Sequence, residues 1–440
     1  MNRYEEKTAC RICGNKELFP VLNLGKQVLS GIFPDDSNVV IPSTPLEVLK
    51  CDDTSSPEAC GLVQLRHSAD VEEMYGTTYG YHSSLSNSMV THLNGILEKL
   101  SCIRSLREGD RILDIGCNDG TLLGLIKTPG VHRVGIDPSS RKFLEKFDND
   151  ISVICDFFSH DLVLKKVPDA SFSQITAIAM FYDLDEPGEF LRDVGRLLSD
   201  DGIWALELAY MPSMLTNLVY DQICHEHVTY PALRQIERLA KDADLRILDV
   251  SLNDVNGGSF LIVGCRGDNS SYIENSSVKS IRMSESILNE KKELEIFADR
   301  IQDHRRDVRQ FLLGAAENRQ SVIGYGASTK GNIVLNYCGV GNDLLTAVCD
   351  ANPEKWGRVT PGSQIPIISK EEMRARKPDI LFVLIWHFYE EVLKDEERFI
   401  REGGRIVFDL PQVHIVDESN YDDHLKSGFS RYSFSHAEAG

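Results

Sequence analysis

Short apolar runs alternate with segments of helical periodicity through the middle of the chain. Aliphatic runs predict strands at 111–115, 131–136, 152–154, 174–180 and 202–207, and a further pair at 245–252 and 259–265. The segments that separate the first five runs have the apolar spacing of helices. Five strands that alternate with helices predict a parallel sheet covered on both faces, and the last pair predicts an antiparallel edge.

The same alternation returns near the end of the chain. A second Rossmann-like unit is indicated by apolar runs at 321–325, 347–350, 380–385 and 405–408. Apolar residues over 287–312 recur at helical spacing and predict a long helix that bridges the two units and packs against both. A shorter helix is expected over 89–106. Residues after about 413 are polar and predict a partly ordered tail.

The turn after the first central strand has the composition of a nucleotide-binding corner. Gly116 and Gly120 turn the strand into a helix, and such glycines let a ligand approach the main chain. The next strand ends in Asp137, where a carboxylate can accept both hydroxyls of a ribose. Asp114 lies inside the turn, where it would repel a pyrophosphate and attract the ammonium of an amino acid. Together these features favour S-adenosylmethionine over NAD as the cofactor.

Two pairs of cysteines near the N-terminus predict a metal site. Cys10 and Cys13 form a C-x-x-C knuckle, whereas Cys51 and Cys60 are separated by eight residues. Four thiolates satisfy a tetrahedral Zn²⁺, and a longer loop can preserve that geometry. We therefore expect the four cysteines to hold a structural zinc ion, because so small a region could hardly bury its own core. The alternative is a metal-free hairpin with unrelated thiols.

The composition and net charge of the chain restrict the classes of molecule that we expect it to bind. The chain has 440 residues, of which 42% are hydrophobic and 8% aromatic, as is typical of a globular protein with several domains. A formal net charge of −20 without a basic stripe argues against nucleic acid as a partner. Neither a membrane span nor a signal segment is found, so we expect a cytoplasmic protein with no membrane partner. In that reducing compartment the eleven cysteines are thiols or metal ligands.

A dense cluster of titratable groups follows the fifth central strand. His225, Glu226 and His227 lie on a connecting segment beside the carboxyl ends of the strands, where open α/β sheets bind ligands. An imidazole titrates near neutral pH and can take a proton from a carbon acid or a hydroxyl. A neighbouring carboxylate would orient one ring and favour its charged form. A metal site and a purely structural role for both histidines are the alternatives.

Three further segments offer candidate ligand contacts. The second glycine-rich turn, 324–332, contains Lys330, whose ammonium suits a phosphate. Asp156 and Phe157 follow the third central strand, where a side chain can either reach an adenine ring or simply pack. The stretch 74–89 has aromatic hydroxyls between glycines, which is typical of a ligand-facing loop and also of a domain junction.

Several segments together resemble one family, the three-domain, S-adenosylmethionine-dependent C-methyltransferases that act on nucleotide-linked keto-deoxysugars. The segments that carry the resemblance follow the family's order over nearly the whole chain, at 10–14, 60–65, 79–81, 113–120, 180–185, 225–227, 256–259 and 324–332. The resemblance implies an α/β fold in which an N-terminal zinc-binding domain precedes a central Rossmann-like methyltransferase domain and a C-terminal Rossmann-like domain that helps to bind the nucleotide sugar. We place these domains and the tail at 1–72, 73–280, 281–412 and 413–440.

The resemblance also implies a reaction, which is methylation at C3 of a 4-keto sugar, commonly a thymidine-diphosphate sugar, in the biosynthesis of a branched-chain deoxysugar. A C4 ketone acidifies the C3 hydrogen, so a base can form an enolate whose carbon attacks the sulfonium methyl. His227 is the expected base, with Glu226 and His225 beside it. Tyr79 or Tyr81 is expected to hold the C4 oxygen as charge develops.

Further site residues are assigned from the matching motifs. Expected cofactor contacts are Asp114, Gly116, Asn118, Gly120, Asp137, Asp156, Phe157 and Phe181. Expected substrate contacts are Tyr182, Cys224, Asn256, Ser259, Ala327, Ser328, Lys330 and Asn332. Cys224 stands where some members of the family carry a tyrosine, a departure that bears on which sugar is bound. Two other functions stay open, an NAD-dependent oxidoreductase acting on a nucleotide sugar and a zinc-containing nucleotide-binding protein without catalysis. Both a monomer and a homo-oligomer are compatible with the sequence.

Overall fold

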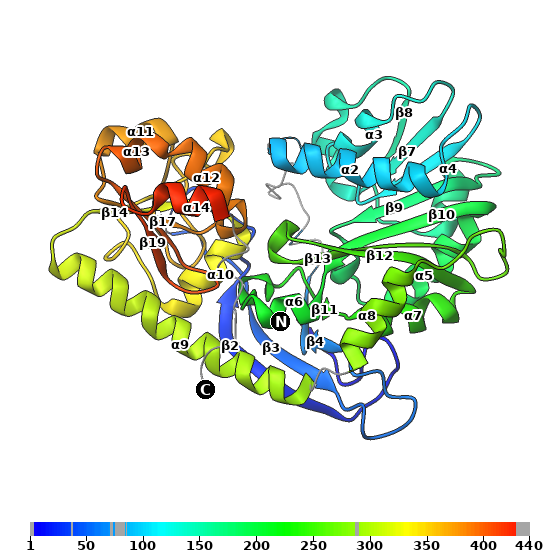
Figure 1. Cartoon of the computed structure of the whole chain (residues 1–440), viewed down its shortest axis with the longest axis horizontal. Helices are drawn as coiled ribbons and strands as arrows, with labels where there is room; N and C mark the ends of the chain where they lie inside the picture. The colour runs from blue at the N-terminus through cyan, green and yellow to red at the C-terminus, as the bar shows by residue number, and fades with distance from the viewer. Residues whose placement is uncertain are drawn as a thin grey trace.

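Two α/β lobes stand side by side in the computed structural model, with the N-terminal strands and helix α9 (Glu290–Glu317) extending below them (Figure 1). The structure describes residues 4–36, 38–70, 74, 84, 86–286 and 290–427. Among the described helices, none combines the length and the apolar character that crossing a bilayer requires.

A seven-stranded sheet forms the central lobe, in the order β12-β13-β10-β9-β6-β7-β8. Its strands are β6 (Arg111–Ile115), β7 (His132–Ile136), β8 (Ile151–Ile154), β9 (Phe172–Ile178), β10 (Leu198–Ala209), β12 (Leu245–Asn253) and β13 (Ser259–Arg266). The first five are parallel, and β13 lies antiparallel between β10 and β12. The prediction of a parallel sheet with an antiparallel pair is confirmed.

Apolar residues on both faces of β6 explain why the strand is buried. Ile112 and Leu113 point to opposite faces, belong to different core clusters and are both fully buried. The lobe's helices are α2 (Asn87–Ile103), α3 (Thr121–Leu125), α4 (His160–Lys166), α5 (Pro187–Leu197), α6 (Met211–Thr216), α7 (Leu233–Asp242) and α8 (Ser276–Ser286). Helix α2 ends earlier than predicted, because Arg104 turns extended and its guanidinium binds Asp110 and Asp201.

The C-terminal lobe repeats this architecture on a smaller scale. Its six strands lie in the order β16-β15-β14-β17-β18-β19, and all but β19 are parallel. They are β14 (Val322–Tyr325), β15 (Val348–Cys349), β16 (Ile367–Ile368), β17 (Ile380–Val383), β18 (Arg405–Phe408) and β19 (His414–Val416). The covering helices include α10 (Thr329–Cys338), α11 (Lys370–Arg376), α12 (Tyr389–Asp395) and α13 (Glu397–Arg401).

Within the polar segment predicted to be a partly ordered tail, the described residues 414–427 include a strand and a helix. Strand β19 pairs antiparallel with β18, and helix α14 (Tyr421–Ser427) follows it. Val416 and Tyr421 are almost fully buried. Two well-placed apolar side chains are therefore enough to fix a segment whose composition is otherwise polar.

The N-terminal strands form a platform that also takes in a piece of the central lobe. Strands β2 (Leu18–Val28), β3 (Ser43–Cys51) and β4 (Val63–Leu65) make an antiparallel sheet, and β11 (Thr229–Tyr230) adds to β4. A two-stranded sheet joins β1 (Tyr4–Glu6) to β5 (His67–Ala69). The platform is thus tied to the chain directly after the histidine pair.

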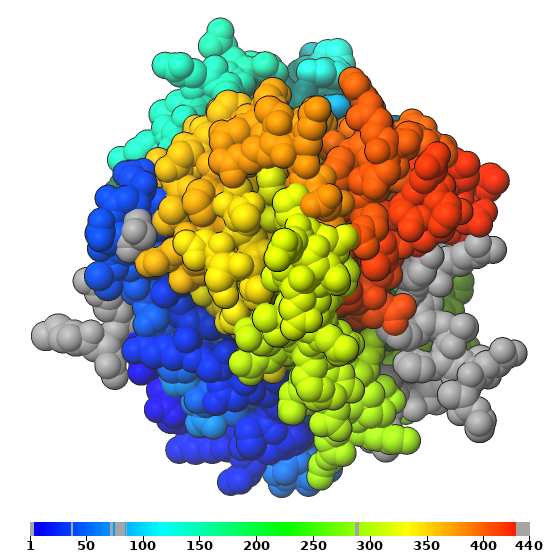
Figure 2. Space-filling model, turned by 90° about the vertical axis from the view of Figure 1, so that its left-hand side faces the viewer, coloured from blue at the N-terminus to red at the C-terminus, as the bar shows by residue number. Residues whose placement is uncertain are grey.

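The prediction of a long helix that bridges the two lobes is confirmed, because helix α9 contacts both of them. It buries an apolar stripe that includes Leu294, Phe297, Ile301 and Val308. It packs against α10 of the C-terminal lobe, β2 of the platform and α6 of the central lobe. Figure 2 shows it lying across the surface between the N-terminal strands in blue and the C-terminal segments in red.

Candidate functional site

The glycine-rich corner of the central lobe lies where the sheet order reverses. Strand β6 sits between β7 and β9, and ligands of such sheets bind at this switch point. Gly116 and Gly120 have φ angles of 75° and 77°, in the left-handed region. A Cβ on Gly120 would lie 2.5 Å from the ring of Phe147. The tight turn therefore needs glycine at both positions.

The backbone of the corner fixes the carboxylate of Asp137. The N–H of Asn118 donates to Asp137 Oδ2 at 2.9 Å, and the N–H of Ser139 donates to Oδ1 at 2.6 Å. The carboxylate is thereby held beside the turn, where remaining lone pairs can accept ribose hydroxyls.

Asp114 is buried inside the same corner. Its Oδ1 accepts a hydrogen bond of 2.6 Å from Thr176 Oγ1, and burial raises the pKa of the carboxyl to about 7. A cationic group placed against it would favour the ionised form. The corner thus offers a carboxylate for an ammonium and another for a ribose.

The other expected cofactor contacts differ from one another in their exposure to solvent. Asp156 is exposed, and its Oδ1 accepts the N–H of Phe157, whose ring is 48% exposed beyond β8. That ring is free to stack on an adenine. Phe181 is 1% exposed and packs edge-on against Phe190, with ring centroids 5.5 Å apart. Its side chain is a core residue, so only its main chain is available to a ligand.

His227 is held in one tautomer. Its Nδ1 lies 3.0 Å from the carbonyl oxygen of Gln222, and its ring packs on that of Tyr182 with centroids 4.1 Å apart. Because a carbonyl only accepts, Nδ1 carries the proton and Nε2 keeps a free lone pair. Burial, reinforced by the charge of Lys330, lowers the pKa of His227 to about 3. The ring is therefore a neutral base that is still partly exposed.

His225 and Glu226 face the N-terminal platform instead. The Nε2 of His225 donates to the carbonyl of Thr44 at 3.1 Å, and the side chain is 1% exposed. A Cβ on Gly31 would lie 2.8 Å from Glu226 Oε1, so this carboxyl also points into the platform. Burial raises the pKa of Glu226. Neither side chain is open to a ligand as His227 is.

Lys330 reaches from the first turn of α10 across to the central lobe. Its Nζ donates to Asn256 Oδ1 at 3.1 Å, and Gln222 Nε2 donates to the carbonyl of Asn256 at 2.6 Å. Asn256 adopts a left-handed φ of 58° that turns its side chain at this point. A chain of contacts thus joins His227, Gln222, Asn256 and Lys330 across the two lobes.

The second glycine-rich corner repeats the geometry of the first. The N–H of Ala327 donates to Asp350 Oδ2 at 2.8 Å, and the N–H of Asn352 donates to Oδ1 at 2.8 Å. Ser328 caps α10 by accepting the N–H of Gly331. The side chain of Asn332 donates to the carbonyl of Ser30, so it ties α10 to the platform.

The remaining expected substrate contacts are structural or lie outside the described residues. Cys224 is 1% exposed, and burial raises the pKa of its thiol. Ser259 donates to the carbonyl of Val255 and so shapes the loop that presents Asn256. Tyr79 and Tyr81 fall outside the residues that the structure describes.

The four N-terminal cysteines converge. Their sulfur atoms all lie within 4.8 Å of one another, with 3.4 Å between Cys10 and Cys60 and 3.6 Å between Cys13 and Cys51. Zinc–sulfur bonds of about 2.3 Å in a tetrahedron separate the sulfurs by about 3.8 Å. The donor set and its spacing fit a zinc ion, and the long loop between Cys51 and Cys60 does not prevent this.

Comparisons with known proteins match three successive parts of the chain to known domains. Residues 10–75 match a zinc binding domain, 91–250 a methyltransferase domain, and 254–411 a C-methyltransferase C-terminal domain. The chain is 28% identical to C-methyltransferase NovU of Streptomyces niveus, over 92% of this chain and 96% of that protein. These matches identify the chain as a C-methyltransferase. This C-methyltransferase takes its methyl group from S-adenosylmethionine, and its cysteine cluster is a structural zinc site.

Other matches of the C-methyltransferase are more distant. The 27-O-demethylrifamycin SV methyltransferase of Amycolatopsis mediterranei is 26% identical over 31% of this chain and 53% of that protein. An S-adenosylmethionine-dependent methyltransferase from Clostridium acetobutylicum is 13% identical, covering 40% of this chain and 92% of its own, with a TM-score of 0.32. The magnesium protoporphyrin IX methyltransferase of Synechocystis is 12% identical over 40% and 79%, with a TM-score of 0.30.

Sequence analysis did not identify three further polar residues of the C-methyltransferase, the buried Glu207 and Asp221 and the half-buried His387. Glu207, at the end of β10, accepts from His92 at 2.7 Å and from Asn253 at 2.8 Å. Asp221 accepts from the indole of Trp386 at 2.9 Å, and His387 follows that tryptophan. Two of them have a signal in the sequence, because Glu207 is a lone charge in an apolar run and His387 lies just beyond the carboxyl end of β17.

Proposed function

We propose that this C-methyltransferase methylates C3 of a 4-keto-deoxyhexose carried on a nucleoside diphosphate. The observation that carries the proposal is the chain of contacts from His227 through Gln222 and Asn256 to Lys330. It brings a neutral base of the central lobe and a cation of the second nucleotide-type lobe to one place. Such a pairing suits a substrate that has both an acidic C–H bond and a diphosphate.

In this proposal Nε2 of His227 removes the C3 proton, and the electron pair of the C–H bond moves into the enolate. The C3 carbon of the enolate then attacks the sulfonium methyl, the carbon–sulfur bond breaks, and its electron pair stays on the sulfur. The proton on His227 passes to solvent. Positioning of the carbon in line with the methyl supplies much of the acceleration.

In this proposal the glycine-rich corner of the central lobe binds the donor, and that of the C-terminal lobe binds the sugar nucleotide. In the central lobe, Asp114 pairs with the ammonium of the donor, Asp137 accepts its ribose hydroxyls, and the ring of Phe157 covers its adenine. In the C-terminal lobe, Asp350 accepts the ribose of the sugar nucleotide. Lys330, whose pKa burial lowers, binds the diphosphate or the enolate oxygen. The matched geometry of the two corners supports this division.

Two readouts test the proposal. Thymidine-diphosphate 4-keto-6-deoxyhexoses are incubated in D₂O without donor to follow exchange at C3, and with labelled S-adenosylmethionine to follow methyl transfer. We expect the wild type to do both. His227→Ala should lower both rates by about 10²-fold or more, the usual worth of a general base. Exposed His132 on β7 provides the matched control, and His132→Ala should retain full activity.

Full exchange by His227→Ala would remove this residue as the base. Failure of every 4-keto sugar nucleotide in the panel would remove the substrate class, even if the base assignment survived with another carbon acid. Lys330→Ala adds a further arm, since it should raise the KM for the sugar nucleotide and leave S-adenosylhomocysteine binding unchanged.

A further inference from the structure

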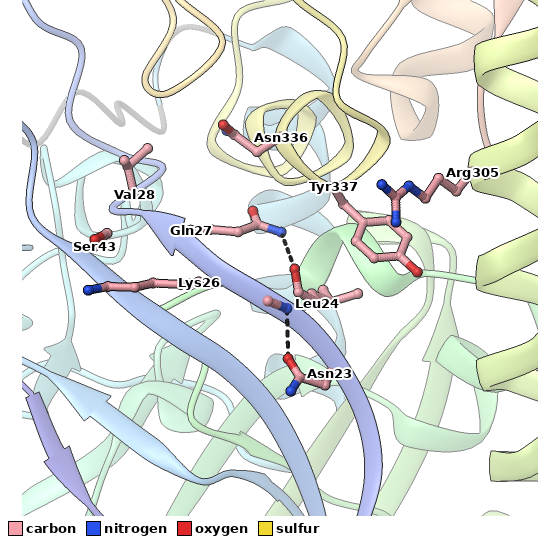
Figure 3. A pocket seen from close by; sticks show the side chains of 10 residues that line it. Asn23, Leu24, Lys26, Gln27, Val28, Ser43, Arg305, Asn336 and Tyr337 are labelled. Atoms are coloured by element: carbon pink, nitrogen blue, oxygen red, sulfur yellow. Dashed lines mark hydrogen bonds between the residues drawn. The ribbon is translucent and has the colours of Figure 1, made fainter.

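A hollow lies at the C-terminal end of helix α10, about two turns along the helix from Lys330. It is bounded by β2, the middle of α9 and the C-terminal end of α10, and its volume is about 790 Å³ (Figure 3). Small-molecule sites commonly measure about 300–1,000 Å³. Its α10 wall is formed by Asn336 and Tyr337, whereas Lys330 lies in the first turn of the same helix, about 10 Å away along its axis. The hollow is therefore separate from the catalytic site.

Charge in the hollow is opposite to that of the whole chain. Lys26 and Arg305 line it, and no carboxylate does, although the chain has a net charge of −20. The guanidinium of Arg305 lies over the ring of Tyr337, 5.1 Å from its centroid. Within the described chain, neither Lys26 nor Arg305 forms an ion pair with a carboxylate. Two uncompensated cations favour an anionic occupant.

The strand that supplies Lys26 is distorted at this point. The register of β2 against β3 shifts between Asn23 and Lys26, and the side chain of Asn23 accepts the N–H of Gly25 at 2.7 Å. Such bulges re-aim side chains and are frequent beside functional sites. In Figure 3, Lys26 and Arg305 extend to opposite sides of the hollow, with the amide of Gln27 between them.

Gln27 supplies an independent sign of a ligand. Its side chain is only 5% exposed, and its Nε2 donates to the carbonyl of Leu24 at 3.3 Å. Its Oε1 is buried and has no partner in the described chain. A buried acceptor without a donor destabilises the folded chain, because it has lost its hydrogen bond to water. A hydroxyl group of a ligand would satisfy it.

We propose that this hollow is a second small-molecule site, which binds a phosphorylated, hydroxyl-bearing compound of the sugar phosphate class. The planar guanidinium of Arg305 suits a phosphate bidentately, and Lys26 adds positive charge on the opposite side of the hollow. Gln27 Oε1 accepts a hydrogen bond from a hydroxyl of the ligand, whereas the amide N–H groups of Asn336 already donate to two backbone carbonyls. The polar lining excludes an apolar ligand, and the acidity of the remaining surface excludes nucleic acid.

Calorimetric titration of the zinc-loaded full chain with glucose 1-phosphate, inorganic phosphate and citrate tests the proposal. Glucose 1-phosphate should bind at one saturable site, more tightly than either other anion. Arg305→Ala should weaken it at least tenfold while methyl transfer stays unchanged. Gln27→Met, which keeps the packing volume, should weaken glucose 1-phosphate and leave inorganic phosphate unaffected.

Two control variants locate the binding. Arg306 is the exposed neighbour of Arg305 on α9 and pairs with Asp303, so Arg306→Ala should leave the affinity unchanged. Lys330→Ala should also leave it unchanged. Three results would overturn the proposal: no saturable binding of glucose 1-phosphate, tighter binding of citrate, or a loss of affinity in Lys330→Ala with none in Arg305→Ala, which would place the anion in the catalytic site.

Discussion

Asp114 is the buried carboxyl that, in the proposed function, pairs with the ammonium of the donor. Its carboxyl has a pKa raised to about 7 by desolvation, so it is largely protonated at pH 6 and largely ionised at pH 8. The ammonium of the donor favours the ionised form. Below pH 7 the protein must therefore release a proton when the donor or its product binds.

The affinity for S-adenosylhomocysteine should consequently rise with pH. Ionisation with a pKa of about 7 predicts a Kd about tenfold lower at pH 8 than at pH 6, with a plateau above that. Calorimetry at pH 6 in buffers of different ionisation enthalpy should detect the released proton. Asp114→Asn should bind more weakly and without this pH dependence. An equal Kd at both pH values in the wild type would exclude the pairing.

Residue types at strand ends were predictable, whereas their partners were not. Asp114 is the penultimate residue of β6 and Asp137 directly follows β7, which places both at the binding edge of a parallel sheet. Glu207 meets His92 of α2 and Asn253 of β12 only because the sheet order places these elements around β10. His225 binds the platform whereas His227 stays partly exposed. This difference likewise depends on the position of the platform, which no local sequence pattern specifies.

At the scale of elements, the zinc loops and the catalytic segment share one sheet. The backbone N–H of Arg11, inside the first knuckle, donates to Gln64 of β4 at 2.9 Å. Strand β4 pairs with β11, which begins two residues after His227. The zinc ion is therefore expected to stabilise the segment that carries the base, besides its own loops.

Loss of zinc should thus reduce catalysis and leave the affinity for the donor largely unchanged. Cys13→Ser should lower the zinc content and the melting temperature, and reduce methyl transfer by at least tenfold. The affinity for S-adenosylhomocysteine should remain close to that of the wild type, because the donor corner lies on β6 and β7. Exposed Cys102 gives the control, and Cys102→Ser should change none of these quantities. Full methyl transfer by a zinc-free variant would contradict this coupling.

Elements with their own apolar pattern were predictable, and elements made by tertiary pairing were not. The central strands and α9 follow from periodicity alone. Strand β11 has two residues and exists because β4 offers it an edge. The same applies to β19, whose pairing with β18 orders a polar segment. Short strands of this kind carry too few residues for a pattern.

At the scale of the whole molecule, the sheet of the central lobe and the sheet of the C-terminal lobe have the same strand order. The strand orders β8-β7-β6-β9-β10 and β16-β15-β14-β17-β18 are equivalent, and each first turn is closed by a backbone N–H to an acid on the next strand. The sequence indicated both units through their glycine-rich turns. How they face each other is decided by α9 and the platform, through long-range contacts that no motif encodes.

His304 of α9 lies at the centre of these contacts. Its Nδ1 accepts from the hydroxyl of Tyr220 at 3.0 Å in the central lobe, and its Nε2 donates to the carbonyl of Asp409 at 2.7 Å in the C-terminal lobe. In the neutral ring both nitrogens have a partner, and burial lowers the pKa of His304 to about 4. Protonation would therefore place a charge in the buried contact that holds the lobes together.

The free energy of unfolding should therefore depend on pH through His304. An unfolded histidine takes up a proton near pH 6.5, whereas folded His304 does so only near pH 4, so acid favours the unfolded chain. Between pH 7 and pH 4 the wild type should lose about 3 kcal/mol more unfolding free energy than His304→Gln, whose amide can keep both hydrogen bonds without titrating. Urea unfolding at a series of pH values gives the difference directly, because all other titrations are common to both proteins. Parallel stability curves would show that His304 stays neutral in the unfolded chain or titrates freely in the folded one.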